Sequence, residues 1–384
     1  MFSRKNLTIF LASIFGNFSF NLLTFGVVFF AQTRYHASPS EIGIANSCYS
    51  FSYLAGCLLL QRLIAAIPPK RCLMFGSLGL LCGALLILLA PEMLVCDAGY
   101  LVCGLATAFF WPPMIGWLAE GLDGKRLGLA TAIFNACWSS GSIVSPYVGG
   151  LLCDHNPDWT IYIANAVFAT GAVYFLVWNL QGKARSASSV SGSSHTYHPT
   201  WLRLPSWLGE TSSYVLLGFL CGVYPLIATR ELGFTPSGIG AFLTARILVQ
   251  SIAMLLLGFF VFWQFNYLFM HLSHLADLVL LLSLAFLRNH YALLIAFICI
   301  GVSAASSYTA SLFHGVTGSR NKTTASAIHE ACIGVGQVVG YILGGVIYQH
   351  FGLRPAVFTL AAICAISPVT DILYRLFVPH KGKP

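Results

Sequence analysis

Long apolar stretches alternate with short polar ones along almost the whole chain. Apolar stretches of about 20 or more residues are long enough to cross a bilayer as a helix. They fall near residues 7–33, 42–66, 72–95, 97–120, 127–153 and 158–180, and again near 206–229, 238–262, 267–287, 290–314, 323–349 and 355–378. The one Ser-rich segment, QGKARSASSVSGSSHTYHPTWLRLP, separates the two groups. The pattern predicts twelve transmembrane helices in two six-helix bundles, residues 1–180 and 206–384, joined by a linker at 181–205.

Composition supports an all-α polytopic membrane protein that lies in a lipid bilayer. The chain is 57% hydrophobic and 8% charged, whereas soluble domains are roughly 25% charged. The first apolar stretch is longer than the roughly 7–15 residues of a signal-peptide core, which indicates a retained span. The twelve cysteines form no CxxC motif, so we expect neither a metal nor another cofactor. The net charge of +8 comes from loops and does not indicate nucleic-acid binding.

The distribution of basic residues predicts the orientation. With an even number of spans, the termini and even-numbered loops hold fifteen Lys and Arg residues, and the opposite loops hold four. Cytoplasmic loops of membrane proteins carry the excess of basic residues. We therefore expect both termini and the linker to be cytoplasmic, in the cytoplasmic (inner) membrane.

The two halves repeat each other. When the chain is shifted by 195 residues, ATAIFNACWSSGSIVSPYVGG at 130–150 aligns with ASAIHEACIGVGQVVGYILGG at 325–345. Likewise, SPSEIG at 38–43 matches TPSGIG at 235–240. The shared small residues, spaced by four, are typical of close helix packing, and we predict that role for both stripes. Pro146 is expected to bend its helix, with the freed carbonyl met by a neighbouring side chain.

These features together resemble the major facilitator superfamily of secondary transporters. The resemblance spans roughly residues 7–378 and rests on the 6+6 helices and the SPSEIG and TPSGIG turns. It rests also on the basic loop CLLLQRLIAAIPPKR and on GSIVSPYVGG, which is similar to the helix-5 signature of the family's antiporters. The resemblance implies two pseudo-symmetric bundles that rock about a central site, lined by helices 1, 4, 7 and 10. The family's usual helix-4 arginine is Tyr100 here.

What the repeated helices do not share is a charge. His329 and Glu330 stand where the first half has Phe134 and Asn135. Ionisable residues inside a membrane are costly, and they commonly mark substrate or proton paths. We predict proton coupling through Glu330 and His329. The alternative is a structural carboxylate that is hydrogen-bonded to a neighbouring helix.

Arg246 is the one Lys or Arg placed well inside a predicted span. Its guanidinium stays charged and must find an anion or a polar cavity. Either it pairs with an internal acid or it binds an anionic group of the substrate. Gln250 lies one helical turn on and shares its face.

Other polar and aromatic residues inside the predicted spans are candidates for substrate binding. Besides Arg246 and Gln250, the predicted set comprises Asn17, Asn21, Trp111, Asn135, Trp138, Tyr214, Tyr224, Tyr308 and Gln337. Trp111 is expected at a bend in FFWPP. His271, His274 and Asp277, spaced by three, fan too widely around one helix for a compact metal site and indicate a local hydrogen-bonded cluster. Asp371 and Arg375, spaced by four, are expected to pair.

Taken together, these features predict a secondary active transporter that moves a small organic solute by alternating access, and not an enzyme. LAEGLDGKR has Ala119 where a phosphate-binding loop needs glycine, which argues against ATP-driven transport. The expected partners are the solute, with an anionic solute as one alternative, and protons, and the expected state is a monomer. The helix-5 resemblance favours efflux, whereas the absent helix-4 arginine argues against an ordinary proton antiporter, so both directions stay open. The alternative function is a non-transporting solute receptor of the same fold.

Overall fold

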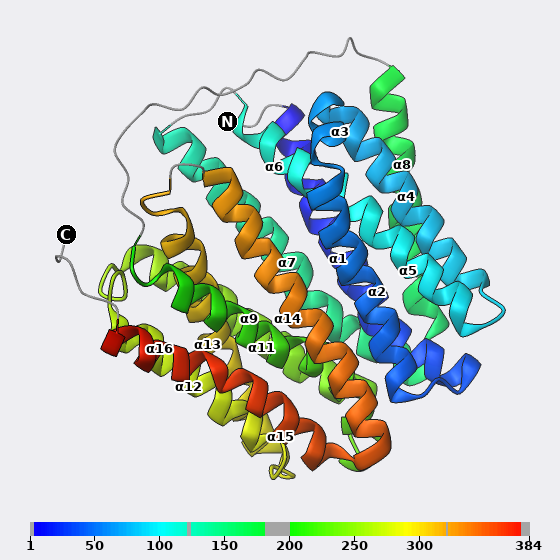
Figure 1. The fold of residues 1–384 in the computed structure, drawn as a ribbon. Coiled ribbons are helices and arrows are strands. Elements are labelled where there is room, and N and C mark those ends of the chain that lie inside the picture. Colours follow the sequence, from blue (N-terminus) through cyan, green and yellow to red (C-terminus); the bar gives the residue numbers. More distant parts are fainter. Residues whose placement is uncertain (1–3, 121–123, 181–199, 320–321, 378–384) are drawn as a thin grey trace. The chain divides into compact units, whose positions relative to one another are not determined.

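The structure is a computed structural model that describes residues 4–120, 124–180, 200–319 and 322–377. The described residues form helices and no strand (Figure 1). The helices are α1 (Arg4–Tyr35), α2 (Pro39–Leu59), α3 (Gln61–Ala66), α4 (Pro69–Leu89), α5 (Met93–Ala108), α6 (Trp111–Ala119), α7 (Gly124–His155), α8 (Asp158–Leu180), α9 (Arg203–Gly222), α10 (Tyr224–Glu231), α11 (Pro236–Phe259), α12 (Tyr267–Ser283), α13 (His290–Val316), α14 (Lys322–Phe351), α15 (Leu353–Cys364) and α16 (Ile366–Phe377).

The helices confirm a multi-pass membrane architecture. Within the described residues, nine spans are long and apolar enough to cross a membrane when α5–α6 and α15–α16 each count as one, or ten if the bent pair α9–α10 is also one span. The remaining two predicted spans correspond to α7 and α12. Of these, α12 has only 17 residues, and α7 is diluted by serines, Asn135 and Pro146. The outward-facing side chains of many helices are large and apolar, as in Leu89 and Phe259, which suits contact with lipid.

The two repeated turns each begin a helix. Ser38 caps α2: its Oγ accepts from the Glu41 backbone N–H, and its own N–H donates to the Glu41 carboxylate at 2.7 Å. At the start of α11, the Oγ1 of Thr235 accepts from the Gly238 backbone N–H at 3.0 Å. In both motifs proline follows the capping residue, where its missing N–H costs nothing. The repeat in sequence is therefore a repeat in local structure.

Proline and aromatic pairs interrupt several spans. The helix is interrupted within FFWPP, because α5 ends at Ala108 and α6 starts at Trp111, and the bend expected there stays a prediction. The axis between α9 and α10 bends by 49° at Val223, just before Tyr224-Pro225. Pro146 instead stays inside α7. The Ser145 hydroxyl donates to the Ser142 carbonyl at 3.3 Å, the group that loses its backbone donor to proline.

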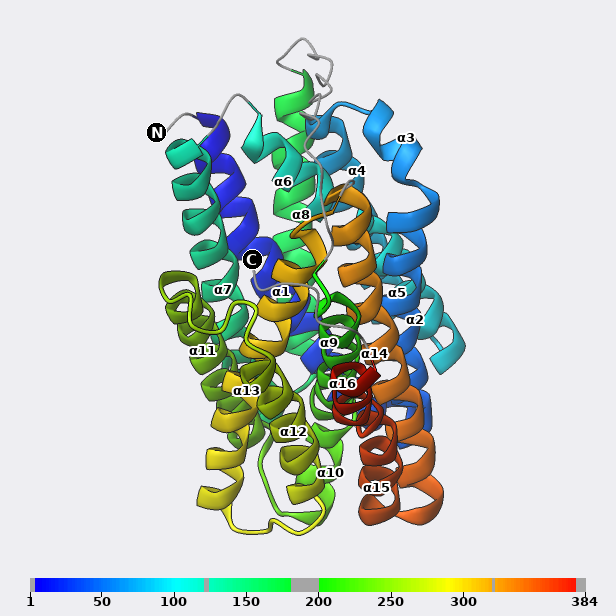
Figure 2. The same cartoon turned by 60° about the vertical axis from the view of Figure 1, so that its left-hand side comes forward.

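The chain divides into two compact units. Unit 1 comprises Met1–Ser191 and Ala228–Thr244, and unit 2 comprises Gly192–Ile227 and Ala245–Pro384. Within unit 1, α1 runs beside α7, and within unit 2, α9 runs beside α14 (Figure 1). Figure 2 shows α12 beside α15 and α16, also in unit 2. Most of the predicted linker, residues 181–199, lies outside the described residues.

Candidate functional site

A stripe of glycines on α14, formed by Gly336, Gly340 and Gly344, places this helix directly against α9. A Cβ atom on Gly336 or Gly340 would overlap the carbonyl oxygens of Thr211 and Val215, respectively. Unit 1 repeats the arrangement, since a Cβ on Gly141 of α7 would overlap the Ile14 carbonyl of α1. The prediction that both stripes serve packing is confirmed. The close approach also brings the polar residues at the start of α14 next to those of α9.

Three carboxyl groups come together inside unit 2. Glu210 of α9 and Asp277 of α12 are 0% and 1% exposed, whereas Glu330 of α14 is partly accessible. Glu210 interacts electrostatically with both Asp277 and Glu330. Neither oxygen of Glu210 has a hydrogen-bond partner among the described residues, and Oδ1 of Asp277 has none either. The Oδ2 atom of Asp277 accepts from the Ser307 hydroxyl at 3.1 Å.

Aromatic residues and a histidine surround Glu330. Nδ1 of His329 lies 2.9 Å from the Ser311 Oγ, and the Tyr308 ring meets the imidazole edge-on, with centroids 4.8 Å apart. His329 is buried, and its Nε2 has no partner within the described structure. Tyr214 and Tyr308 are half-buried, and both interact electrostatically with Glu210 and Glu330. The predicted residues Tyr214, Tyr308, His329 and Glu330 therefore belong to one cluster.

Arg246 lies buried in α11 with a neutral partner. Its Nη1 donates to Oε1 of Gln250 at 2.7 Å, which confirms the shared face expected from their spacing. In the described part of the chain, the ion pairs are those of His271 and His274 with Asp371. The fixed internal pair considered for Arg246 is therefore absent there. Its Nε is also buried without an acceptor, so the guanidinium keeps capacity to bind an anion.

The unit 1 candidates divide into packing and accessible residues. The Asn17 amide donates to the Trp138 carbonyl at 2.7 Å and to the Ser142 hydroxyl, so it ties α1 to α7. Asn21 donates to Asn17 at 2.8 Å and is half-buried, like Trp111. Trp111 meets Phe110 edge-on. The side chains of Asn135 and Trp138 are exposed.

Two unit 2 candidates take part in packing. Tyr224 is 1% exposed and lies between Phe219 and Phe297, with centroid distances of 5.8 and 5.9 Å. The backbone of Gln337 lies against Gly218 of α9, and its side chain is half-buried. We keep Gln337 and leave Tyr224 out of the proposed solute site.

Sequence reasoning missed the roles of two carboxylates. Glu210 shows the same signal as Glu330, an acid inside a predicted span, and this signal could have identified it. Asp277 was grouped with His271 and His274, yet both imidazoles instead contact Asp371.

The prediction that Asp371 pairs with Arg375 is wrong. The Arg375 guanidinium lies over the Tyr267 ring, 4.8 Å from its centroid. The aromatic face offers the exposed cation a partner at the helix end, while the fully buried carboxylate is held by the histidines.

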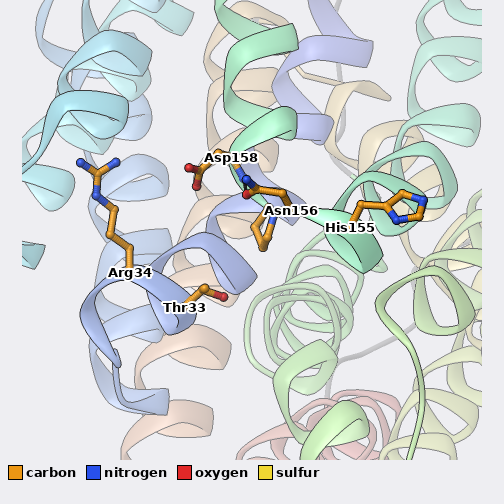
Figure 3. A pocket seen from close by; sticks show the side chains of 6 residues that line it. Thr33, Arg34, His155, Asn156 and Asp158 are labelled. Atoms are coloured by element: carbon orange, nitrogen blue, oxygen red, sulfur yellow. Dashed lines mark hydrogen bonds between the residues drawn. The ribbon is translucent and has the colours of Figure 1, made fainter.

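A surface pocket of about 460 Å³ lies at one end of unit 1. Figure 3 shows its lining residues from the end of α1 and from the turn between α7 and α8: Thr33, Arg34, His155, Asn156, Pro157 and Asp158. None of the predicted substrate-binding residues lines this pocket. It shares no residue with the carboxylate cluster of unit 2.

Comparison with known proteins places the chain in a transporter family. The sequence model of the Major Facilitator Superfamily matches residues 9–204 and 206–384. The chain belongs to the major facilitator superfamily, and it is a membrane transporter by family and fold.

Relatives and solved structures agree with this assignment. Multidrug resistance protein 1 of Bacillus subtilis (strain 168) is 22% identical over 366 residues, which cover 90% of this chain and 91% of that protein. Multidrug resistance protein 2 of the same organism is 20% identical over 236 residues, 58% of either chain.

Among solved structures, a POT family transporter in complex with 5-aminolevulinic acid matches with a TM-score of 0.79 and 10% identity, covering 98% of this chain and 96% of that one. A bacterial homologue of the human lysosomal transporter Spinster, in an inward-facing and occupied conformation, matches with a TM-score of 0.70 and 14% identity, with both chains covered in full. At these identities the structural matches establish the fold.

Proposed function

We propose that the chain is a proton-coupled secondary transporter that moves a small organic solute by alternating access, with Glu330 as the coupling carboxyl group. The observation that carries this proposal is the position of Glu330. It is partly accessible, it is not paired with a cation in the described structure, and it interacts with the buried Glu210. Removal from water disfavours a charged carboxylate. A carboxyl group so placed can take up and release a proton as its exposure alternates.

We assign the solute contacts to two sets of residues. Unit 2 provides Arg246 and Gln250 together with Tyr214, Tyr308 and Gln337, and unit 1 provides Asn21, Trp111, Asn135 and Trp138. The available guanidinium favours a solute that carries an anionic group, because such pairs form strong charge-assisted hydrogen bonds. The names of the two Bacillus relatives refer to drug resistance. We therefore propose a drug-like organic compound as the substrate class and export as the direction.

Arg246→Lys should weaken solute binding more than it reduces the amount of folded protein. Lysine keeps the charge but loses the planar fork of donors. Loss of one charge-assisted hydrogen bond should raise KM by about tenfold or more. Transport rate against solute concentration, normalised to folded protein from size-exclusion chromatography, measures this change. Arg288→Lys, at an exposed arginine, is the matched control. Collapse of folded protein with an unchanged KM would instead assign Arg246 to structure.

We propose a monomer in the cytoplasmic membrane with both termini inside the cell. In a background depleted of native cysteines, Arg62→Cys in α3 should resist a membrane-impermeant thiol reagent in intact cells. His155→Cys, at the other end of the unit 1 helices, should react. Both positions are exposed, so reactivity reports the side of the membrane. Labelling of Arg62→Cys before the cells are opened would reverse the orientation.

A further inference from the structure

Two histidines and a carboxylate form a buried hydrogen-bonded cluster in unit 2, away from Glu330. The Nδ1 atoms of His271 and His274, one turn apart on α12, lie 3.2 and 2.8 Å from the same Oδ2 atom of Asp371 on α16. The side chains of His274 and Asp371 are 0% exposed, whereas that of His271 is 18% exposed. Nε2 of each ring can bind or release a second proton.

The His271 end of this cluster adjoins the surface. Its ring stacks on Tyr267 with a centroid distance of 5.6 Å. Tyr267 and Arg375 line a surface pocket of about 550 Å³, together with Trp201, Gln264, Phe265, Asn266 and Leu268. The ring of Tyr267 therefore separates this pocket from the imidazole of His271.

The His274 end leads to the buried carboxyl groups. Its Nε2 has no partner within the described residues and faces Gly209, where a Cβ atom would overlap it. Gly209 directly precedes Glu210. His274 also interacts electrostatically with Asp277, one turn further along α12, and Asp277 interacts with Glu210. A series of electrostatically interacting ionisable groups thus runs from the pocket to the neighbourhood of Glu330.

We propose that His271, Asp371 and His274 form a proton relay between the pocket at the start of α12 and the buried pair Asp277 and Glu210. A proton binds Nε2 of His271, and the Nδ1 proton of that ring moves to Oδ2 of Asp371. The Oδ2 proton then moves to Nδ1 of His274, which releases its Nε2 proton toward Asp277. One proton enters and one leaves. Each ring then carries its proton on the other nitrogen, and the starting tautomers return when each ring loses that proton to water and takes up another on its original nitrogen. Proton transfer from His274 to Asp277 uses a bridging water or a change of side-chain rotamer.

The charged groups around the relay favour proton transfer from the pocket toward the buried carboxyl groups. The facing ionisable groups are Glu210 on α9, Tyr267 and Asp277 on α12, Cys364 on α15 and Arg375 on α16, while α13 contributes the hydroxyls of Ser303 and Ser307. The permanent charge of Arg375 lies at the pocket end of the relay and opposes retention of a proton there. The carboxylates of Asp277 and Glu210 lie at the buried end and attract the proton.

The relay exchanges protons between the buried carboxyl groups of the coupling site and the pocket, so it rests on the proposed function, but its test needs no solute. Purified protein is subjected to a rapid pH drop while infrared absorption of protonated carboxyl groups is followed. Glu210→Gln and Asp277→Asn identify the bands of the buried pair. In His274→Gln and Asp371→Asn, those bands should reach the wild-type final amplitude but rise about 100-fold more slowly, as expected when a positioned proton donor is lost. His350→Gln, at an exposed histidine of α14, should leave the rate unchanged.

His271→Gln provides a second test at a partly exposed position, where folding is less at risk than at Asp371. It should slow the same bands without changing their final amplitude. An unchanged rate in folded His271→Gln and His274→Gln, or no band assignable to Glu210 or Asp277, would overturn the relay. The relay is tested by the protonation rate of Glu210 and Asp277, whereas Glu330 is tested by gradient-driven transport, so failure of the coupling group and failure of the relay give different results.

Discussion

Glu330→Gln is expected to abolish solute movement driven by a pH gradient while solute-for-solute exchange continues. Exchange needs the binding site and the conformational change, but it needs no net proton transfer. In the wild type, a gradient of about one pH unit can support about tenfold accumulation for each coupled proton. The Gln variant should fall to no accumulation. The measurement is flux in liposomes, with a compound first identified by thermal-shift screening of the purified protein.

The internal repeat indicates that the Glu330→Gln variant will be stable. The repeat-equivalent residue in α7 is Asn135, so the matching helix already carries a neutral amide at this position. Glu231→Gln, at an exposed carboxylate, is the control and should behave as the wild type does. If Glu330→Gln retains full gradient-driven transport, Glu330 is a structural carboxylate, as the alternative interpretation of the sequence allows.

Gly340→Leu should strongly destabilise unit 2. A side chain at Gly340 would overlap the Val215 carbonyl, with Phe219 N at 2.8 Å and the Gly218 Cα at 3.1 Å from the new Cβ. These are backbone atoms, so relief requires α9 and α14 to separate. Overpacking typically costs about 1–3 kcal/mol, and we expect at least the upper part of this range. The melting temperature and the monodisperse fraction in size-exclusion chromatography measure the loss.

Gly258→Leu in α11 is the matched control, because no heavy atom lies within 4 Å of its Cβ position. It should melt close to the wild type. Equal melting of the two variants would show that the α9–α14 contact does not depend on the glycine stripe.

Much of the fold could be predicted because its determinants are local or repeated. In lipid each span must satisfy its own backbone hydrogen bonds, which makes helices of about 20 residues the available solution. The turns at Ser38 and Thr235, the break before Trp111 and the glycine stripes all depend on neighbouring residues or on helical spacing. The shared face of Arg246 and Gln250 follows from spacing alone.

The carboxylate network could not be predicted because it joins distant segments. The contact of His274 with Asp371 spans 97 residues of sequence, and the interaction of Glu210 with Glu330 also joins separate helices. Spacing rules treat each helix alone, so they paired Asp371 with Arg375. Burial decides otherwise, since a buried carboxylate needs hydrogen-bond donors and an exposed arginine does not need that partner.

The most direct test of the central claim is flux of the identified compound in liposomes that contain only the purified protein, with no ATP and an imposed pH gradient. We predict that the compound moves against its own gradient only while the pH gradient lasts, and that protons cross the membrane in the opposite direction as it moves. Binding of the compound without any flux would indicate a receptor of the same fold. Flux that is unaffected by collapse of the pH gradient would contradict proton-coupled transport.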